Sequence, residues 1–287
     1  MKLALIGEGI AQSQSPDLHQ RLGRQLGVPT QYDLIDALLQ TDFDFATAVA
    51  QAKAAGYRGL NITYPFKERA VRLADDLSIG VTNVGSTNTL LFEGDRIRAE
   101  NTDYSGFIRA YRLRFQTRPP GDVLLLGAGG VGRAVACALG HLGVSRLYVV
   151  ERDAARGQAL CNDLCAQGIN ARTLTPEQAD GRLSEFDGVV NCTPVGHLNH
   201  PGCPVQAQRL VRNQWVFDAV YIPARTELLR AAENAGAATL SGVDLFVCQG
   251  VDAFCLFAGT AVDRAALDAE VQRLREHYLH QLLRQAS

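Results

Sequence analysis

The stretch Val123–Ala134 places the strongest constraint on how this 287-residue chain can fold. Four apolar residues run into a glycine-rich turn, and a helix-like apolar pattern follows. This order of strand, tight turn and helix start is typical of a loop that binds a dinucleotide pyrophosphate. Gly127 would make the turn, Gly129 would let the backbone approach a phosphate, and Gly132 would let the helix pack close to the strand. The alternative interpretation is a glycine turn in an unrelated α/β protein.

Strand and helix patterns alternate along the chain, which predicts an α/β fold with a parallel sheet and right-handed crossovers in the second half. Strands are expected at Leu3–Ile6, Gln31–Ile35, Gly59–Ile62, Val123–Leu126, Arg146–Val150, Asn170–Leu174, Gly188–Asn191 and Trp215–Ala219, and a hairpin at Asn88–Phe92 and Ile97–Ala99. A helix from about Tyr104 to Phe115 precedes the breaker cluster Arg118–Gly121, and the domain boundary is expected near it.

The expected organisation has two domains. An N-terminal α/β domain would cover residues 1–103 and be completed by residues 245–287, and a Rossmann dinucleotide-binding domain would cover residues 104–244. The last helical pattern, Arg264–Leu283, is long and amphipathic. We expect this helix to return to the first domain.

Composition excludes some partners and suggests a compartment. The formal net charge of −2 gives no electrostatic reason to expect nucleic acid or an anionic membrane as a partner. No apolar run reaches the roughly 18–20 residues of a membrane helix, and the run at Met1–Gly7 is too short for a signal peptide. Seven cysteines, an odd number, favour reduced thiols and a cytoplasmic location.

Three polar clusters precede the glycine loop, and each allows a purely structural interpretation. In Ser13–Pro16, Ser15 would cap a helix with Pro16 at its first position, or the two serines would bind a polyol or carboxylate. Lys67 would be an ordinary surface lysine, or it would face a ligand with the polar residues that follow the strand ending at Ile62.

In the third cluster, Asn101-Thr102-Asp103, either Thr102 or Asp103 would simply cap the helix that follows. Three such clusters in order before a nucleotide loop favour a functional interpretation over three separate structural ones.

Taken together, these motifs resemble the shikimate/quinate dehydrogenase family, and the resemblance covers nearly the whole chain in order. The matching motifs are Ser13-x-Ser15-Pro16-x-x-His19, Asn61-x-Thr63-x-Pro65-x-Lys67, Gly85-x-x-Asn88-Thr89, Asn101-Thr102-Asp103, Gly127-Ala128-Gly129-Gly130-x-Gly132, Asn191-x-Thr193-Pro194-x-Gly196, Asp218-x-x-Tyr221-x-Pro223 and Gln249-Gly250-x-x-Ala253-Phe254.

The resemblance implies an oxidoreductase that passes hydride between shikimate, or a close analogue, and a nicotinamide cofactor. It implies Lys67 and Asp103 as the catalytic pair, because the hydroxyl that loses hydride must also lose its proton. The substrate-binding residues implied are Ser13 and Ser15 for the carboxylate, Asn61, Thr63, Asn88 and Gln249 for hydroxyls, and Tyr221 near the nicotinamide. The expected ligand is therefore a cyclic polyol carboxylate of the shikimate pathway of aromatic amino acid biosynthesis, or quinate.

The sequence contains features that favour NAD and others that favour NADP. The cofactor-binding residues implied are Gly127, Ala128, Gly129, Gly130, Val131, Gly132, Glu151, Arg152, Asp153, Arg156, Thr193 and Gly242. An acid at Glu151 suits a ribose 2′-hydroxyl and repels a 2′-phosphate, which favours NAD. Arg152 and Arg156 keep the arginines of the family's NADP pattern, while Glu151 and Asp153 replace its Asn and Thr. We expect NAD or NADP with a preference for NAD, and use of both is the main alternative.

Departures from the family pattern leave the substrate open. Tyr104 stands where Gly is common, Ser86-Thr87 replace a small apolar pair, and the segment from Gly242 to Leu245 lacks its usual methionine. The chain could therefore act on shikimate, quinate or an amino analogue, or be a paralogue that senses such a ligand without turnover. No metal is expected, because His197 and His200 lack a third ligand in the pattern. A monomer or a homodimer is expected.

Overall fold

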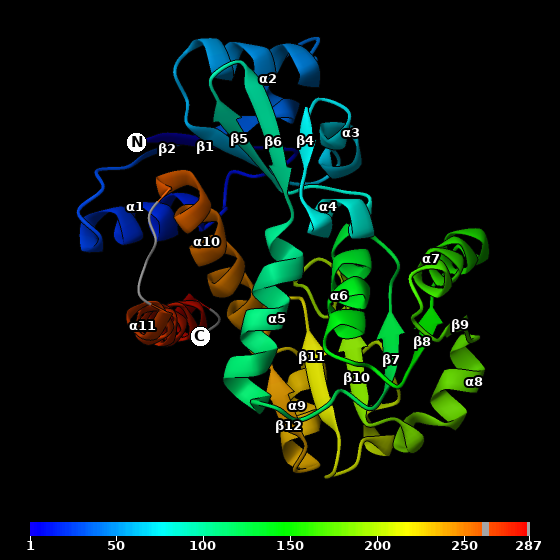
Figure 1. Cartoon of the computed structure of the whole chain (residues 1–287). Helices are drawn as coiled ribbons and strands as arrows, with labels where there is room; N and C mark the ends of the chain where they lie inside the picture. Colours follow the sequence, from blue (N-terminus) through cyan, green and yellow to red (C-terminus); the bar gives the residue numbers. More distant parts are fainter. Residues whose placement is uncertain (260–263, 286–287) are drawn as a thin grey trace. The chain divides into compact units, whose positions relative to one another are not determined.

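The computed structural model describes residues 1–259 and 264–285 as a mixed α/β protein (Figure 1). Its contacts separate the chain into two compact units. Unit 1 comprises Met1–Gly106 and Val247–Val271, and unit 2 comprises Phe107–Phe246 and the chain from Gln272 onward. Each unit contains one six-stranded sheet.

Unit 1 has a mixed sheet in the order β2-β1-β3-β5-β6-β4. Its strands are β1 (Lys2–Gly7), β2 (Gln31–Asp36), β3 (Gly59–Ile62), β4 (Asp76–Leu77), β5 (Thr89–Glu93) and β6 (Arg96–Glu100). Its helices include α1 (Ser15–Gln25), α2 (Phe45–Ala54), α3 (Lys67–Val71), α4 (Ile79–Val84), the start of α5 (Thr102–Phe115) and most of α10 (Gly242–Ala258). Strand β1 is parallel to β2 and β3, whereas β5 runs antiparallel to β3 and β6.

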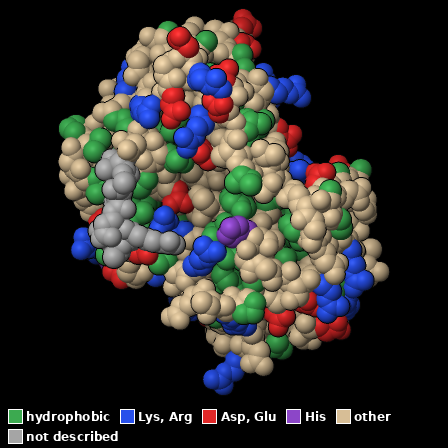
Figure 2. Space-filling model, in the orientation of Figure 1, with side chains coloured by type: hydrophobic (Ala, Val, Ile, Leu, Met, Phe, Trp, Pro, Cys, Tyr) green, Lys and Arg blue, Asp and Glu red, His purple; other side chains and the backbone are tan. Residues whose placement is uncertain are grey.

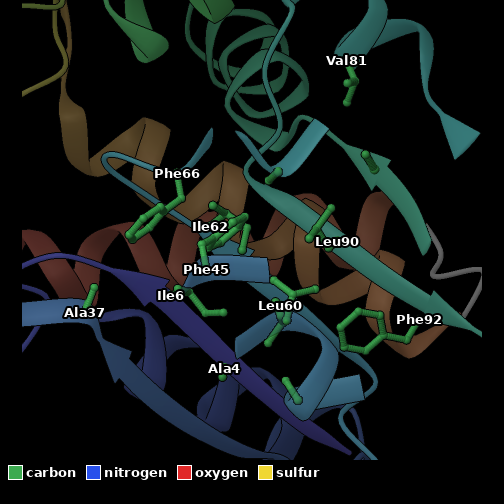
Figure 3. Close-up of a cluster of buried hydrophobic side chains, with 14 residues drawn as sticks. Ala4, Ile6, Ala37, Phe45, Leu60, Ile62, Phe66, Val81, Leu90 and Phe92 are labelled. Atoms are coloured by element: carbon green, nitrogen blue, oxygen red, sulfur yellow. The ribbon is translucent and has the colours of Figure 1, made fainter. Parts of the chain in front are cut away.

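Apolar side chains cover both faces of this sheet. On one face, Phe45 of α2 stacks on Phe66 with ring centroids 4.7 Å apart, above Ile6 and Leu60 (Figure 3). On the other face, Phe257 of α10 packs with buried residues of β1, β2 and β5. Because the middles of the central strands are apolar and covered, their functional polar groups are confined to the strand ends.

Unit 2 has an all-parallel sheet in the order β12-β11-β10-β7-β8-β9. Its strands are β7 (Asp122–Leu126), β8 (Arg146–Val150), β9 (Ala171–Thr173), β10 (Gly188–Asn191), β11 (Trp215–Asp218) and β12 (Ala238–Leu240), and its helices include α6 (Gly130–His141), α7 (Ala154–Ala166), α8 (Pro176–Gly181) and α9 (Glu227–Asn234). Val216 packs with Leu228 of α9, while the next residue, Phe217, meets Phe107 of α5 edge-on at 5.0 Å. Helices therefore cover both faces, and the predicted Rossmann-type α/β unit is confirmed.

The terminal helix α11 (Arg264–Gln285), which we expect to return to the first domain, is divided between the two units. Its residues up to Val271 group with unit 1, but those from Gln272 group with unit 2. The reason is specific contacts with the start of α10, where the Tyr278 ring meets Phe246 edge-on at 5.2 Å and Arg275 pairs with Asp244. The domain limits at 103 and 245 stay a prediction.

Two further observations concern the molecular surface. Among the residues that the structure describes, no helix is long and apolar enough to cross a membrane. On the face seen in Figure 2, Lys and Arg side chains are interspersed with Asp and Glu, in keeping with the formal net charge of −2.

Candidate functional site

The centre of the candidate site in unit 1 is an ion pair between Lys67 and Asp103. Lys67 is the first residue of α3, which follows the loop at the carboxyl end of β3, and Asp103 lies in the first turn of α5. Lys67 Nζ lies 2.6 Å from Asp103 Oδ2, and the two side chains are only 16% and 10% exposed. This is a charge-assisted hydrogen bond held largely out of solvent. Lys67 is thus not an ordinary surface lysine.

The alternative interpretation, in which Thr102 or Asp103 only caps α5, is wrong. Asn101 Oδ1 accepts the backbone N–H of Tyr104 at 3.0 Å, so Asn101 supplies the capping bond. Asn101 is itself held, because its Nδ2 donates to the carbonyl of Ser86 at 2.8 Å. The Asp103 carboxylate is therefore left to pair with the lysine.

The expected capping of α1 by Ser15 is also wrong. The helix begins at Ser15, with Gln14 at the N-cap position and no side-chain capping bond, so Pro16 is the second helical residue. Ser13 Oγ accepts the backbone N–H of Ser15 at 3.3 Å. Helix capping therefore does not account for the Ser15 hydroxyl, and both serines stand at the start of a helix where an anion is favoured.

Asp36, at the end of β2, anchors the loop that carries these serines. Its carboxylate accepts the backbone N–H groups of Gly9 at 3.0 Å, Ile10 at 2.9 Å and Leu38 at 3.1 Å. Burial alone would raise the pKa of Asp36, but these three bonds outweigh it and hold the pKa below its ordinary value. The loop then continues to Ser13, whose N–H donates to the carbonyl of Ile10 at 2.9 Å.

A polar network joins Asn61, Asn88 and Gln249, three of the predicted hydroxyl-binding residues of unit 1. Asn61 Nδ2 donates to the carbonyl of Asn88 at 3.3 Å and to Thr89 Oγ1 at 3.2 Å. The N–H of Thr102 donates to Asn88 Oδ1 at 2.8 Å, and the Thr102 hydroxyl reaches Gln249 Oε1 at 3.4 Å. The network therefore runs from β3 through β5 to α5 and α10. Sequence reasoning assigned no site role to Thr89 or Thr102.

Thr63 occupies the loop directly after β3. Its N–H donates to the carbonyl of Ile6 at 2.9 Å, and a Cβ added at Gly7 would lie 2.3 Å from its methyl group. The lack of a side chain at Gly7 thus leaves space for Thr63, which is half-buried. The structure places Thr63 on the loop that leads to Lys67.

In unit 2, the glycine loop has the shape of a phosphate cradle. Gly127 has φ +95°, which favours glycine, and a Cβ on Gly132 would lie 2.1 Å from the carbonyl oxygen of Gly127. Nothing lies within 4 Å of a Cβ built on Gly129, so the surface there is open. The first amides of α6, at Gly130 and Val131, lie beyond the reach of intrahelical acceptors. These residues fit a dinucleotide pyrophosphate.

The acidic residues after β8 have distinct structural roles. Glu151 Oε2 accepts the N–H of Ala128 at 2.7 Å, and its Oε1 accepts the N–H of Asp153 at 3.1 Å, so this carboxylate is fixed against the glycine loop. Asp153 caps α7 by accepting N–H groups from Ala155 and Arg156. Arg152 and the Arg156 side chain are exposed.

The other predicted residues of unit 2 lie at the ends of β10 and β11. Thr193 Oγ1 donates to Asn191 Oδ1 at 2.6 Å. A Cβ on Gly242 would lie 2.5 Å from the carbonyl oxygen of Ala219, so α10 starts against the end of β11. The Tyr221 ring stacks on Phe246 at 5.4 Å, and burial raises the pKa of Tyr221.

Within residues 1–259 and 264–285, no group of three or more His, Cys, Asp or Glu side chains is placed to hold a metal ion. A glycine cradle in one unit, and a lysine–carboxylate pair among hydroxyls and amides in the other, are features of a nicotinamide-dependent dehydrogenase.

Comparison with known proteins agrees with this class. Residues 5–90 match the family model described as shikimate dehydrogenase substrate binding domain, and residues 113–198 match shikimate/quinate 5-dehydrogenase. The chain is 38% identical over 283 residues to the quinate/shikimate dehydrogenase (NAD(+)) of Corynebacterium glutamicum strain R, covering 96% of this chain and 97% of the relative. The chain belongs to the shikimate/quinate dehydrogenase family and is an NAD(P)-dependent oxidoreductase.

Solved structures show the same relationship. Quinate dehydrogenase from Corynebacterium glutamicum in complex with NAD has a TM-score of 0.90 and 37% identity, covering 98% of this chain and 99% of that one. Shikimate 5-dehydrogenase from Thermus thermophilus in complex with NADP(H) and shikimate has a TM-score of 0.81 and 30% identity, covering 96% and 99%.

Proposed function

We propose that this protein catalyses the reversible oxidation of a ring hydroxyl of shikimate, or of quinate, to the ketone, with NAD or NADP as the second substrate. The observation that carries the proposal is the 2.6 Å pair of Lys67 and Asp103, shielded from solvent at the carboxyl end of β3. The nicotinamide ring supplies the acceptor for the hydride that leaves the carbon. The chain must then remove the proton from the hydroxyl oxygen.

As the neutral amine, Lys67 Nζ takes this proton in the oxidation and becomes the ammonium that pairs with Asp103, and in the reduction the ammonium returns the proton. Asp103 Oδ2 orients the amine, and its other oxygen accepts a hydrogen bond from a second hydroxyl of the ring. Positioned proton transfer of this kind contributes about 10²–10⁴-fold to a rate.

The substrate is held by side chains of unit 1. Ser13 and Ser15, at the start of α1, bind the carboxylate, which the amides of a helix N-terminus also favour. Hydroxyls are bound by the polar residues Asn61, Thr63, Asn88 and Gln249, and the family resemblance assigns Tyr221 to substrate binding near the nicotinamide. An amino analogue and binding without turnover are the competing functions.

The cofactor is held by the glycine loop Gly127–Gly132, with Thr193 and Gly242 supporting it. The fixed carboxylate of Glu151 accepts hydrogen bonds from the adenosine ribose and opposes a 2′-phosphate, which favours NAD. The exposed side chains of Arg152 and Arg156 offset part of this repulsion. We therefore expect a modest preference for NAD.

The double variant Glu151→Asn with Asp153→Thr tests the preference. Threonine is also a good N-cap, so the start of α7 is kept while two negative charges are removed. The ratio of kcat/KM for NADP to that for NAD is expected to rise. A wild type that strongly prefers NADP, or an unchanged ratio, contradicts the assignment.

The function itself is tested by initial rates of nicotinamide reduction with shikimate and with quinate, each with NAD and NADP. Turnover of at least one acid is expected. Isothermal titration with the same acids is the companion measurement, because binding without turnover would support a sensor.

We also propose that the protein is cytoplasmic and is a monomer or a homodimer. Light scattering after size-exclusion chromatography distinguishes the monomer from the homodimer.

A further inference from the structure

We infer that the substrate site has a preset hydrogen-bond polarity, in which Asn61 presents only an acceptor and Asn88 only a donor, and that the buried hydroxyl of Tyr32 is a positioning group that holds the Asn61 acceptor in place. The inference rests on the proposed function and deepens it, because it states which ring substituents the site accepts.

Two backbone groups fix the orientation of the side-chain amides. A backbone carbonyl only accepts, so the 3.3 Å bond to the carbonyl of Asn88 identifies the Asn61 atom as Nδ2. A backbone N–H only donates, so the 2.8 Å bond from Thr102 identifies the Asn88 atom as Oδ1. Rotating the Asn61 amide by 180° would place two acceptors against each other, and rotating the Asn88 amide would place two donors against each other.

The hydrogens and lone pairs can then be counted. Asn61 uses both Nδ2 hydrogens, one on the carbonyl of Asn88 and one on Thr89 Oγ1 at 3.2 Å. The Thr89 hydroxyl passes its own hydrogen to Asn88 Oδ1 at 3.0 Å, where the Thr102 N–H already donates. Asn88 Oδ1 is thus filled, and one Nδ2 hydrogen goes to Thr102 Oγ1 at 3.0 Å. Asn88 is left with one N–H to offer.

Tyr32 completes the network at the other end. Its hydroxyl lies 2.9 Å from Asn61 Oδ1, and since that atom only accepts, the phenol donates. One lone pair of Asn61 Oδ1 is left for a ligand. Tyr32 is 5% exposed and its ring lies 4.7 Å from that of His19, so the phenol is held in place.

The phenol also joins the two ends of the site. Burial raises the pKa of Tyr32 far above its ordinary value, opposed by a hydrogen bond with Ser15, so the phenol keeps its proton and remains a donor. Because its proton goes to Asn61, the phenol can act toward Ser15 only as an acceptor. When the single hydrogen of Ser15 turns to a substrate carboxylate, the phenol stays bound to Asn61, so Tyr32 stands between the serine that binds the carboxylate and the amide that binds a hydroxyl.

The consequence is a rule for the substrate. The ring substituent that meets Asn61 must carry a hydrogen, and the substituent that meets Asn88 must carry a lone pair. A hydroxyl satisfies both positions. An ammonium group, which has no lone pair, fits only at Asn61, whereas fluorine, which donates nothing, is tolerated only at Asn88.

The first test uses the wild-type protein, so it does not depend on the folding of a variant. Dissociation constants are measured by isothermal titration for shikimate analogues in which each ring hydroxyl in turn is replaced by fluorine or by an amino group. At one position fluorine should weaken binding about 3–10-fold more than the amine, and at another the amine should weaken it more than fluorine. Equal effects of the two replacements at every position would overturn the inference.

The second test compares Tyr32→Phe with Tyr57→Phe. The Tyr57 hydroxyl donates to Asp33 Oδ2 at 2.6 Å and does not join the network, so Tyr57→Phe is the matched control. Tyr32→Phe should raise KM and Kd for the acid about 3–10-fold with kcat within about 2-fold, because the bond it removes positions a group that binds ground and transition states alike. The KM for the cofactor should stay unchanged in both variants. An unchanged KM for the acid in a folded Tyr32→Phe protein contradicts the inference.

These outcomes separate the inference from the proposed function. Binding of shikimate or quinate without turnover defeats only the proposed function, since both tests read affinity. Turnover with an unaffected Tyr32→Phe variant defeats only the inference, and a wild type that neither binds nor turns over these acids defeats both.

Discussion

Unit 1 and unit 2 present different kinds of polar group at the carboxyl ends of their strands. In unit 1 the groups at these ends are side chains, and they are joined by hydrogen bonds over several elements. In unit 2 the glycine loop offers backbone amides, and its shape depends on residues that lack a side chain. The difference matches the two ligands expected. A pyrophosphate is the same in every dinucleotide, whereas the hydroxyls of a ring must be recognised one by one.

This difference determines where the sequence tolerates change. In unit 1 a substitution that keeps size but removes one polar group should alter affinity or rate while the fold persists. In unit 2 a single added methyl group should act on the backbone itself. Substitutions in each unit test that contrast.

The largest effect is expected for Lys67→Ala, which removes the proton acceptor of unit 1. We expect kcat to fall about 10²–10⁴-fold, with the fold kept because the side chain is at the end of a short helix. Steady-state kinetics and thermal unfolding are the measurements. Lys53→Ala is the control, since the Lys53 amine donates to the carbonyl of Asp95 outside the site. Turnover close to wild type in a folded Lys67→Ala protein would rule out the assigned role.

A smaller effect, of two distinguishable kinds, is expected for the glycines of unit 2. Gly132→Ala places a methyl group against the carbonyl of Gly127 and should lower the free energy of unfolding by about 1–3 kcal/mol. Gly129→Ala meets open space and has φ −73°, so stability should change little. Its methyl group would instead occupy the approach of the pyrophosphate and raise the cofactor Kd about 10-fold, or 1.4 kcal/mol.

Urea unfolding and cofactor titration of both variants separate these effects. The contrast fails if Gly129→Ala destabilises the apoprotein as much as Gly132→Ala, or if it binds both cofactors normally.

The next largest effect is expected in unit 1, where the backbones of α5 and α10 are in close contact. A Cβ on Gly106 would lie 2.6 Å from the backbone N of Gln249, whereas a Cβ on Gly250 would meet only the end of the Leu18 side chain. Gly106→Ala should therefore displace Gln249 and raise KM for the acid about 3–10-fold, or 0.65–1.4 kcal/mol. Gly250→Ala, the matched control, should have a weaker effect because Leu18 can change rotamer. Equal KM values for the two variants would contradict this positioning by Gly106.

The sequence predicted the elements whose apolar runs are bounded by turn residues. Strands β3 and β10 agree with their predicted limits to the residue, because each is a buried run at the centre of a sheet. Strands β4 and β12 were not predicted, since two and three residues are too short to show a period. The terminal helix was predicted as an element, but its partners, Asp244 and Phe246, have no local signal in the sequence.

The candidate site was predicted only as far as its motifs reach. Lys67 and Asp103 are 36 residues apart in the sequence. Only the resemblance to a family predicted that they form a pair. The hydrogen bond from Tyr32 to Asn61 has no such signal, because it joins two strands that are separated by 29 residues. In the sequence, Tyr32 has the pattern of an ordinary buried strand residue. Capping was wrong at Ser15 for a related reason, since several adjacent polar residues can cap and only the backbone geometry selects among them.

The smallest effect is expected from Asp218, the carboxylate buried at the end of β11 in unit 2. It accepts hydrogen bonds from Asn191, Val220 and Thr226 at 2.6–3.0 Å, yet burial outweighs them and raises its pKa to about 6. Because the folded-state pKa lies above the ordinary value of 3.8, this group stabilises the fold most below pH ~4, and the contribution is lost as pH rises through ~6. Between pH ~5 and ~7 the loss is on the order of 1 kcal/mol.

Asp218→Asn removes the titration and leaves an acceptor for the Val220 N–H, while the Thr226 hydroxyl can accept from the new amide. The free energy of unfolding, measured in urea at several values from pH 5 to 7, should fall with rising pH more steeply in the wild type than in the variant. Parallel curves would show that the buried carboxylate does not titrate in this range. Unit 2 would then hold a charge that its hydrogen bonds fully compensate, and the contrast with the uncharged amide network of unit 1 would be sharper than proposed.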